Sequence, residues 1–297
     1  MASNQLRSDG LLLTSALIWG LAFAFQRQGM QHVGPFTFNA LRFALGAGAL
    51  ALLLRFGPLD GTKSSRLGFP IVGGLLAGLV IFLGAALQQA GLVHTTAGKA
   101  GFITGLYVVF VPLLGLLLHR RTGRWTWAGA LIAAAGLYLL SVKGSFGIAR
   151  GDLLVLLGAV FWASHVLIID RIIHRSNPYR LAIFQYGVCA GASLVAALLT
   201  ETLSGARLAA AGVPILYTGL LSVGIAYTLQ IVAQRRAHPA HAAIILSMES
   251  LFAVLGGWLL LGETLGGRGL TGCALMLGGM LLTQLGGRGS AGKAASN

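Results

Sequence analysis

The chain alternates long apolar stretches with short polar connections along almost its whole length. Ten stretches approach the roughly 20 apolar residues that a helix needs to cross the hydrocarbon layer of a bilayer. They cover residues 9–29, 36–55, 69–93, 98–118, 125–142, 152–173, 179–200, 212–234, 240–261 and 268–286. Because the connections are too short to form a further domain, the pattern predicts an all-α integral membrane protein with ten transmembrane helices.

Composition supports a membrane location, because 56% of the residues are hydrophobic, 9% are charged and the mean hydropathy is +0.82. The 44 glycines would let helices approach one another closely. Cys189 and Cys273 lie inside apolar stretches and show no metal-ligand spacing. The sequence therefore predicts no disulfide, no metal site and no cofactor.

The formal net charge of +14 reflects how basic residues divide between the two sides of the membrane. With the N-terminus in the cytoplasm, that side holds Arg7, Arg55, Lys63, Arg66, Arg120, Arg121, Arg124, Arg171, Arg175, Arg180, Arg235, Arg236, Arg288 and Lys293. The opposite side holds Lys143, Arg150, Arg207 and Arg268. The positive-inside rule then predicts that both termini are cytoplasmic.

This distribution leaves no soluble domain that could carry a basic face for nucleic acid. We expect a multi-pass protein of the bacterial inner (plasma) membrane, with the lipid bilayer and a small-molecule substrate as partners and a monomer as its simplest state. The first stretch is expected to remain in the mature protein, because it is long for the apolar region of a signal peptide and only Arg7 precedes it.

The second half of the chain echoes the first at a fixed offset. Trp19 in SALIWGLAFAFQRQG is matched by Trp162 in GAVFWASHVLIIDRI, and 162 − 19 = 143. The same offset joins Pro35 to Pro178, Gly129 to Gly272 and Gly136 to Gly279. The echo predicts two five-helix repeats, residues 1–148 and 149–297. Since five is odd, the second repeat enters the membrane from the opposite side, an architecture that exposes a site between the halves to either face in turn.

Two segments resemble the bacterial EamA branch of the drug/metabolite transporter superfamily. They are TAGKAGFITGLYVVFVPLLG at residues 96–115 and LSMESLFAVLGGWLLLGETL at residues 246–265. The resemblance implies a transporter fold and, usually, export of small metabolites, and some members of the branch export aromatic amino acids. The Leu-Gly-Glu signature occurs once, because Arg120 stands where the offset places Glu263.

Two tryptophans lie unusually deep in the predicted membrane spans. Trp19 and Trp162 are about ten residues into their helices, which is roughly 15 Å and near the middle of the bilayer. Tryptophan is normally enriched at the interfaces instead. Both indoles either fill space between helices or wall a central cavity. His165 follows Trp162 at i+3 on the same helix face, as a hydrogen-bonded spacer or as a solute contact.

Glu249 is the only carboxylate deep within a predicted span, near the middle of the ninth. It is a candidate cation contact or proton carrier, or it pairs with Lys99 or Arg42 and holds the halves together. Lys99 either reaches the site or extends to water at the membrane interface. Glutamine and tyrosine side chains add hydrogen-bonding capacity. The predicted substrate-binding residues are Trp19, Trp162, His165, Gln26, Gln88, Tyr107, Glu249 and Lys99.

Motifs for chemistry are missing from the sequence. The tail segment GRGSAGK has Ala294 where a phosphate-binding loop needs Ser or Thr, and there is no nucleophile elbow or zinc-protease motif. An enzyme is therefore disfavoured, and saturable counterflow of solute would distinguish a carrier from a passive channel. The sequence predicts a secondary transporter that exports small amphipathic metabolites, best hydrophobic or aromatic amino acids, by alternating access. The alternative is a multidrug efflux protein for lipophilic cations.

Overall fold

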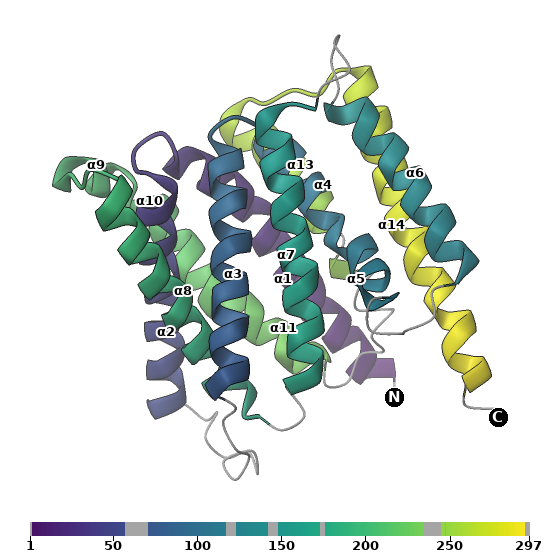
Figure 1. Cartoon of the computed structure of the whole chain (residues 1–297), viewed down its shortest axis with the longest axis horizontal. Helices are drawn as coiled ribbons and strands as arrows, with labels where there is room; N and C mark the ends of the chain where they lie inside the picture. Colours follow the sequence, from purple (N-terminus) through teal and green to yellow (C-terminus); the bar gives the residue numbers. More distant parts are fainter. Residues whose placement is uncertain are drawn as a thin grey trace.

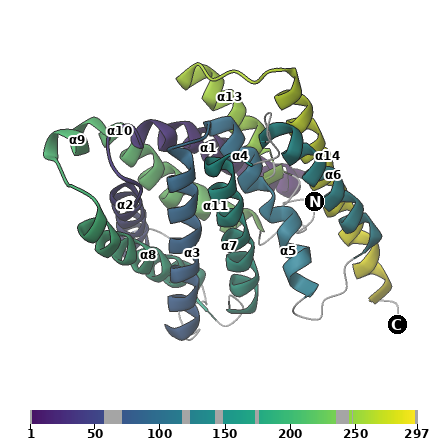
Figure 2. The same ribbon diagram turned by 45° about the horizontal axis from the view of Figure 1, so that its top comes forward.

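The computed structural model describes residues 2–56, 71–116, 123–141, 148–172, 176–234, 245–246 and 248–294, and these ranges are almost entirely helical (Figures 1 and 2). The helices are α1 (Ala2–Gly29), α2 (Pro35–Phe56), α3 (Ile71–Leu92), α4 (Ala97–Gly105), α5 (Tyr107–Leu116), α6 (Arg124–Ser141), α7 (Arg150–Ile172), α8 (Pro178–Thr200), α9 (Gly205–Ala210), α10 (Gly212–Leu216), the π-helix η4 (Tyr217–Ala226), α11 (Tyr227–Gln234), α13 (Glu249–Leu261) and α14 (Gly267–Ala294).

Each of the ten predicted stretches coincides with one helix or with a run of consecutive helices. Seven helices or runs are long and apolar enough to cross a membrane: α1, α2, α3, α4 with α5, α7, α8, and α10 with η4 and the first half of α11. The other three stretches correspond to α6, α13 and α14, of which α13 and α14 provide shorter apolar segments. The predicted all-α membrane fold is confirmed. The start of the ninth stretch, residues 240–244, lies outside the described residues.

The helices begin and end where local chemistry dictates. Asn177 caps α8, its side-chain oxygen accepting hydrogen bonds from the next backbone N–H groups, and Pro178 supplies the fixed φ that suits a first helical position. The hydroxyl of Thr96 caps α4 in the same way. At the other end of α13, Gly262 adopts a φ of 65°, the left-handed conformation that terminates helices and favours glycine.

The packing of the two halves is reciprocal. Equivalent helices pair directly: α2 packs against α8, and α6 against α14. The fourth segments of the two halves meet through α4 and α13. The remaining contacts come in matched sets. α3 packs against α7 as α1 packs against η4 and α11, and α1 packs against α13 as α7 packs against α4 and α5. Exchanging the halves leaves this pattern unchanged, as expected for inverted repeats related by a two-fold axis.

The α6–α14 pair stands at one side of the molecule and shows this symmetry at atomic detail (Figure 1). A Cβ atom placed on Gly136 would lie 2.6 Å from the carbonyl oxygen of Gly272, and one on Gly279 would lie 2.5 Å from that of Gly129. The offset of 143 converts the first contact into the second, because 136 + 143 = 279 and 129 + 143 = 272. The two helices touch backbone to backbone, which only glycine permits here.

Helix α1 begins and helix α14 ends at the same end of the bundle. In Figure 1 the start of α1 and the end of α14 are at the lower end, whereas the connection between α1 and α2 is at the opposite end. We call that opposite end the far end. It also carries the connection from α13 to α14. This arrangement is expected of a chain that crosses the membrane an even number of times.

Each half contains a break in its fourth transmembrane segment. In the first half α4 ends at Gly105 and α5 begins at Tyr107, with a turn at Leu106. In the second half a turn at Met248 precedes α13, which begins at Glu249. The two breaks agree with the repeat to within one residue, since 248 − 106 = 142 and the offset is 143. The expectation that Glu249 lies near the middle of its helix is therefore wrong: Glu249 lies in the first turn, where the helix dipole favours a carboxylate.

Candidate functional site

Tyr107 and Glu249 are positioned by the two helix breaks and lie within electrostatic range of each other. Each is the first residue of its helical segment, α5 and α13 respectively. The Glu249 side chain is buried, and it interacts electrostatically with both Tyr107 and Tyr227. In many transporters, interrupted helices place polar groups at the level of the solute site. The breaks thus unite two residues that the sequence predicted for this site.

Trp19 projects from α1 onto the irregular segment of the second half. Its indole N–H donates to the backbone carbonyl of Ser222, at 3.1 Å, within the π-helix η4. Its ring meets Tyr227 edge-on, with centroids 4.7 Å apart and an interplanar angle of 63°. A π-helical segment within α-helices is frequent at functional sites, and here it positions Tyr227 against Trp19.

An aromatic cluster connects Trp19 to the region of Trp162. Tyr227 packs against Tyr186 with ring centroids 5.6 Å apart, and Tyr186 packs against Phe43 at 5.9 Å. Trp162 packs against the same apolar cluster, which is built around Tyr186 and Phe43. Both tryptophans therefore border one continuous set of aromatic side chains drawn from both halves. Both are only half-buried.

A chain of polar side chains runs from Trp162 to Arg42. The Trp162 indole donates to Oε1 of Gln88 at 2.8 Å. Gln88 donates to Oε1 of Gln26 at 3.4 Å, and Arg42 donates to the same oxygen at 2.9 Å. The four residues come from α7, α3, α1 and α2. Three of the predicted site residues thus belong to one hydrogen-bonded network.

His165 takes part in a separate hydrogen bond. Its Nε2 lies 3.0 Å from Oε1 of Gln185 on α8. Its ring meets that of Trp162 edge-on, at 6.4 Å and 89°, so the two share a face of α7 as predicted. The hydrogen bond fixes the imidazole orientation beside the tryptophan.

Four important residues were absent from the predicted set. Arg42, Tyr186 and Tyr227 belong to the clusters described above, and Asn39 accepts a hydrogen bond from Arg42 at 2.9 Å. The sequence suggested Arg42 only as a possible partner of Glu249, although an arginine inside a transmembrane segment is itself a strong functional signal. The tyrosines gave no such signal, because the fold alone brings α8 and α11 together.

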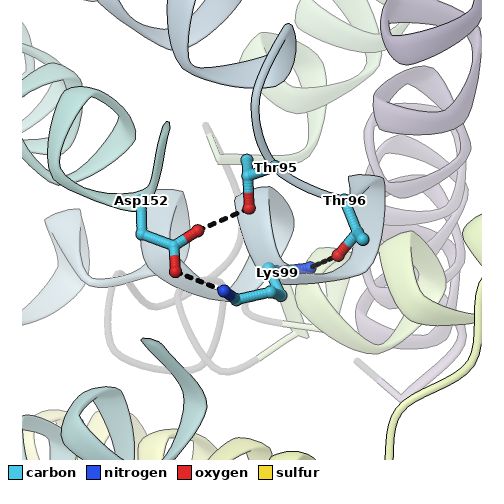
Figure 3. Close-up of polar contacts among 4 residues, drawn as sticks. All are labelled: Thr95, Thr96, Lys99 and Asp152. Atoms are coloured by element: carbon cyan, nitrogen blue, oxygen red, sulfur yellow. Dashed lines mark hydrogen bonds and ion pairs between the residues drawn. The ribbon is translucent and has the colours of Figure 1, made fainter. Parts of the chain in front are cut away.

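Lys99 lies at the far end and forms an ion pair with Asp152, which is fully buried at the start of α7 (Figure 3). The other oxygen of Asp152 accepts a hydrogen bond from the hydroxyl of Thr95. Neither Lys99 nor Arg42 forms an ion pair with Glu249 among the described residues, so the predicted pairing of Glu249 with either cation is not what the structure shows.

Two further carboxylates of the second half cap helices of the first half at the far end. Glu201 accepts hydrogen bonds from the backbone N–H groups of Phe36 and Thr37, each at 2.8 Å, at the start of α2. Glu263 accepts from Ala97 and Gly98, at 2.9 and 3.2 Å, at the start of α4. Together with Asp152 they form what we call the far-end seam. The seam joins the two halves at this end.

A pocket of about 450 Å³ also lies at the far end. It is lined by residues of the α1–α2 connection and of the segment between α8 and α9, including His32, Glu201 and Arg207. It contains none of the predicted site residues. Among the residues that the structure describes, no three His, Cys, Asp or Glu side chains are grouped as metal ligands would be.

The two halves of the chain match the same family model. Residues 6–142 and 149–285 each match the model of the EamA-like transporter family. The chain belongs to the EamA-like transporter family. This family is part of the drug/metabolite transporter superfamily, and the resemblance drawn from the sequence is confirmed.

Individual relatives of this EamA-like transporter agree. A protein of Archaeoglobus fulgidus described as an uncharacterized transporter is 32% identical over 263 residues, covering 88% of this chain and 80% of that protein. An uncharacterized protein of Pseudomonas aeruginosa is 29% identical over 249 residues, 83% of each chain. A protein of known crystal structure is similar in fold, with a TM-score of 0.63, 24% identity and coverage of 97% of this chain and 99% of that chain.

Proposed function

We propose that this EamA-like transporter exports small amphipathic solutes, with hydrophobic and aromatic amino acids as its preferred class. The observation that carries the proposal is the aromatic cluster shared by both halves, with Trp19, Tyr227 and Trp162 half-buried inside the bundle. Aromatic faces bind apolar and aromatic groups well. The buried Glu249 beside Tyr227 supplies a negative charge for an ammonium group.

The proposed mechanism is alternating access around this site. The far-end seam, formed by Asp152, Glu201 and Glu263 with helix ends of the first half, holds one side closed. Release requires these contacts to separate while the cytoplasmic side closes. The helix breaks at Leu106 and Met248 supply the irregular backbone around which segments can move.

We further propose that both termini are cytoplasmic, that the far end faces outward and that the protein resides in the bacterial inner membrane. The distribution of basic residues supports this orientation. Single cysteines at residues 30–34 should react with a membrane-impermeant maleimide added to intact cells. Reaction only after the cells are opened would reverse the orientation. Residues 144–150 form the second loop suited to this test. Of these, residues 144–147 lie outside the described part of the chain.

The second candidate function is efflux of lipophilic cations. Glu249 favours it, since a buried carboxylate attracts a cation. Arg42, also buried and close enough to interact electrostatically with the same Tyr227, opposes it, because a second cation near a guanidinium is repelled. An amino acid carries both charges and suits both residues. For this reason we place amino acids first.

Counterflow in proteoliposomes tests the proposal. Vesicles loaded with unlabelled phenylalanine should accumulate labelled phenylalanine faster than protein-free vesicles, and uptake should saturate. Labelled tryptophan and threonine report the preference for aromatic side chains, and labelled tetraphenylphosphonium reports the alternative. Uptake of the cation together with indifference to all amino acids would contradict the proposal and favour multidrug efflux. Repeating the assay with a pH gradient distinguishes proton coupling from facilitated diffusion.

A further inference from the structure

Arg42 is a buried cation held by uncharged partners. Only 4% of its surface is exposed. Its Nε donates to Oδ1 of Asn39 at 2.9 Å, and one terminal nitrogen donates to Oε1 of Gln26 at 2.9 Å. The guanidinium also lies over the ring of Phe43, 4.8 Å from its centroid. These contacts hold the group rigidly without neutralising its charge.

Within the described part of the chain, no carboxylate forms an ion pair with Arg42. The ion pair found there joins Asp152 to Lys99. Burial of an uncompensated charge is costly, and proteins normally provide a counter-ion. A guanidinium has five N–H donors in a planar fork that matches a carboxylate. The guanidinium of Arg42 therefore lacks a negatively charged hydrogen-bond acceptor among the described residues.

The side-chain amide of Asn39, next to Arg42, also lacks a hydrogen-bond acceptor among the described residues. Because its Oδ1 accepts from Arg42, its amide nitrogen Nδ2 is the atom left over, and this nitrogen is buried with no hydrogen-bond partner among the described residues. A buried donor without an acceptor costs free energy. Arg42 and Asn39 are one helical turn apart on α2, so a single anionic group can serve both.

We propose that Arg42 and Asn39 form a subsite for the carboxylate of the transported solute. The inference rests on the proposed function and extends it, because it assigns the residues that recognise one chemical group. The polar chain from Arg42 through Gln26 and Gln88 ends at the indole of Trp162. A solute anchored by its carboxylate at Arg42 thus has an aromatic surface within the same network.

Binding to the purified, detergent-solubilised protein tests this subsite independently of transport. The probes are 3-phenylpropionate and 2-phenylethylamine, which share a ring and a two-carbon chain but carry opposite charges. Ligand-induced thermal stabilisation reports the affinity of each. The wild-type protein should be stabilised by 3-phenylpropionate at millimolar concentration.

Two variants remove the subsite in different ways. Arg42→Gln should weaken binding of 3-phenylpropionate by about tenfold to hundredfold, the range for losing hydrogen bonds to a charged group. Asn39→Asp is nearly isosteric and gives Arg42 a permanent carboxylate, so the fold should persist while 3-phenylpropionate no longer binds. The matched control is Arg55→Gln, at the exposed cytoplasmic end of the same helix, which should bind the probe as the wild type does.

The proposal is overturned if 3-phenylpropionate leaves the wild-type melting temperature unchanged, or if Asn39→Asp binds it with wild-type affinity. Should Arg42→Gln fail to fold, the Asn39→Asp result decides. Carboxylate binding that depends on Arg42, together with no counterflow of any amino acid, would reject the amino-acid proposal and retain the subsite for another carboxylate.

Discussion

Tyr107 and Glu249 stand at matching breaks in the two halves and interact electrostatically across the interface between them. Neither residue is the sequence equivalent of the other, since the offset pairs Glu249 with Leu106 and Tyr107 with Ser250. The backbone geometry is thus repeated while the side chains differ. The repeat supplies two helix breaks at one level, and divergence has placed a carboxylate at one and a phenol at the other.

Glu249→Gln should slow transport without weakening the fold. The amide keeps the size of the carboxylate and removes a charge that is costly to bury, so the melting temperature should stay constant or rise. Phenylalanine counterflow should fall about tenfold or more, as expected when a charged contact to an ammonium is lost. Unchanged counterflow would remove Glu249 from the solute site.

Glu263→Gln should show the opposite behaviour. The Glu263 carboxylate caps α4 through Ala97 and Gly98, and loss of a helix cap costs about 0.5–2 kcal/mol. Thermal unfolding should shift to lower temperature, while the fraction that remains folded should retain its relative preference among solutes. Glu201→Gln, which removes the equivalent cap of α2, is the matched comparison. A changed solute preference with an unchanged melting temperature would show that Glu263 acts on solute.

The Trp162→Ala variant distinguishes a packing role of the indole from a role in solute binding. If the indole serves only packing, its loss costs about 3–5 kcal/mol and transport of every solute falls in proportion to folded protein. If it walls the solute site, counterflow of phenylalanine should fall more than that of threonine, with the melting temperature little changed. Trp19→Ala and His165→Ala should shift the preference in the same direction. Equal losses for both solutes in both tryptophan variants would show that the repeated tryptophans do not form one site.

Gly279→Ala should destabilise the α6–α14 pair, because its new Cβ would lie 2.5 Å from the carbonyl oxygen of Gly129. The neighbouring Gly278 offers a matched control, since a Cβ there meets nothing within 4 Å. Gly278→Ala should be neutral or slightly stabilising, given the higher helix propensity of alanine. The melting temperatures of the two variants in detergent check this. If both melt alike, the close backbone contact is absent.

Hydrophobic periodicity and the offset of 143 were sufficient to predict the helices and their inverted arrangement, because membrane spans leave a strong local signal. The same offset correctly related Gly129 to Gly272 and Gly136 to Gly279. The breaks at Leu106 and Met248 were not predicted. Leu106 lies in apolar sequence and Met248 lies between Ser247 and Glu249. A local turn at either position depends on packing against the other half.

For the candidate site, sequence reasoning identified side chains but not their partners. Gln26, Gln88 and Trp162 form one network, whereas Lys99 is bound to Asp152 at the far end. Such partners are distant in the chain, and one sequence contains no information about which distant residues meet. Arg42 was recognisable as a charge in a span, but its importance emerges from the orphaned amide of Asn39 beside it.

Cross-linking the far end tests most directly whether the halves must separate there for transport. A Cβ on Gly98 would lie 3.6 Å from that of Val254, a separation suited to a disulfide. In a background with Cys189 and Cys273 replaced by serine, Gly98→Cys with Val254→Cys should lose phenylalanine counterflow on oxidation and regain it on reduction. Each single-cysteine variant should be unaffected by either treatment. Full counterflow by the quantitatively cross-linked protein would contradict alternating access through the far-end seam.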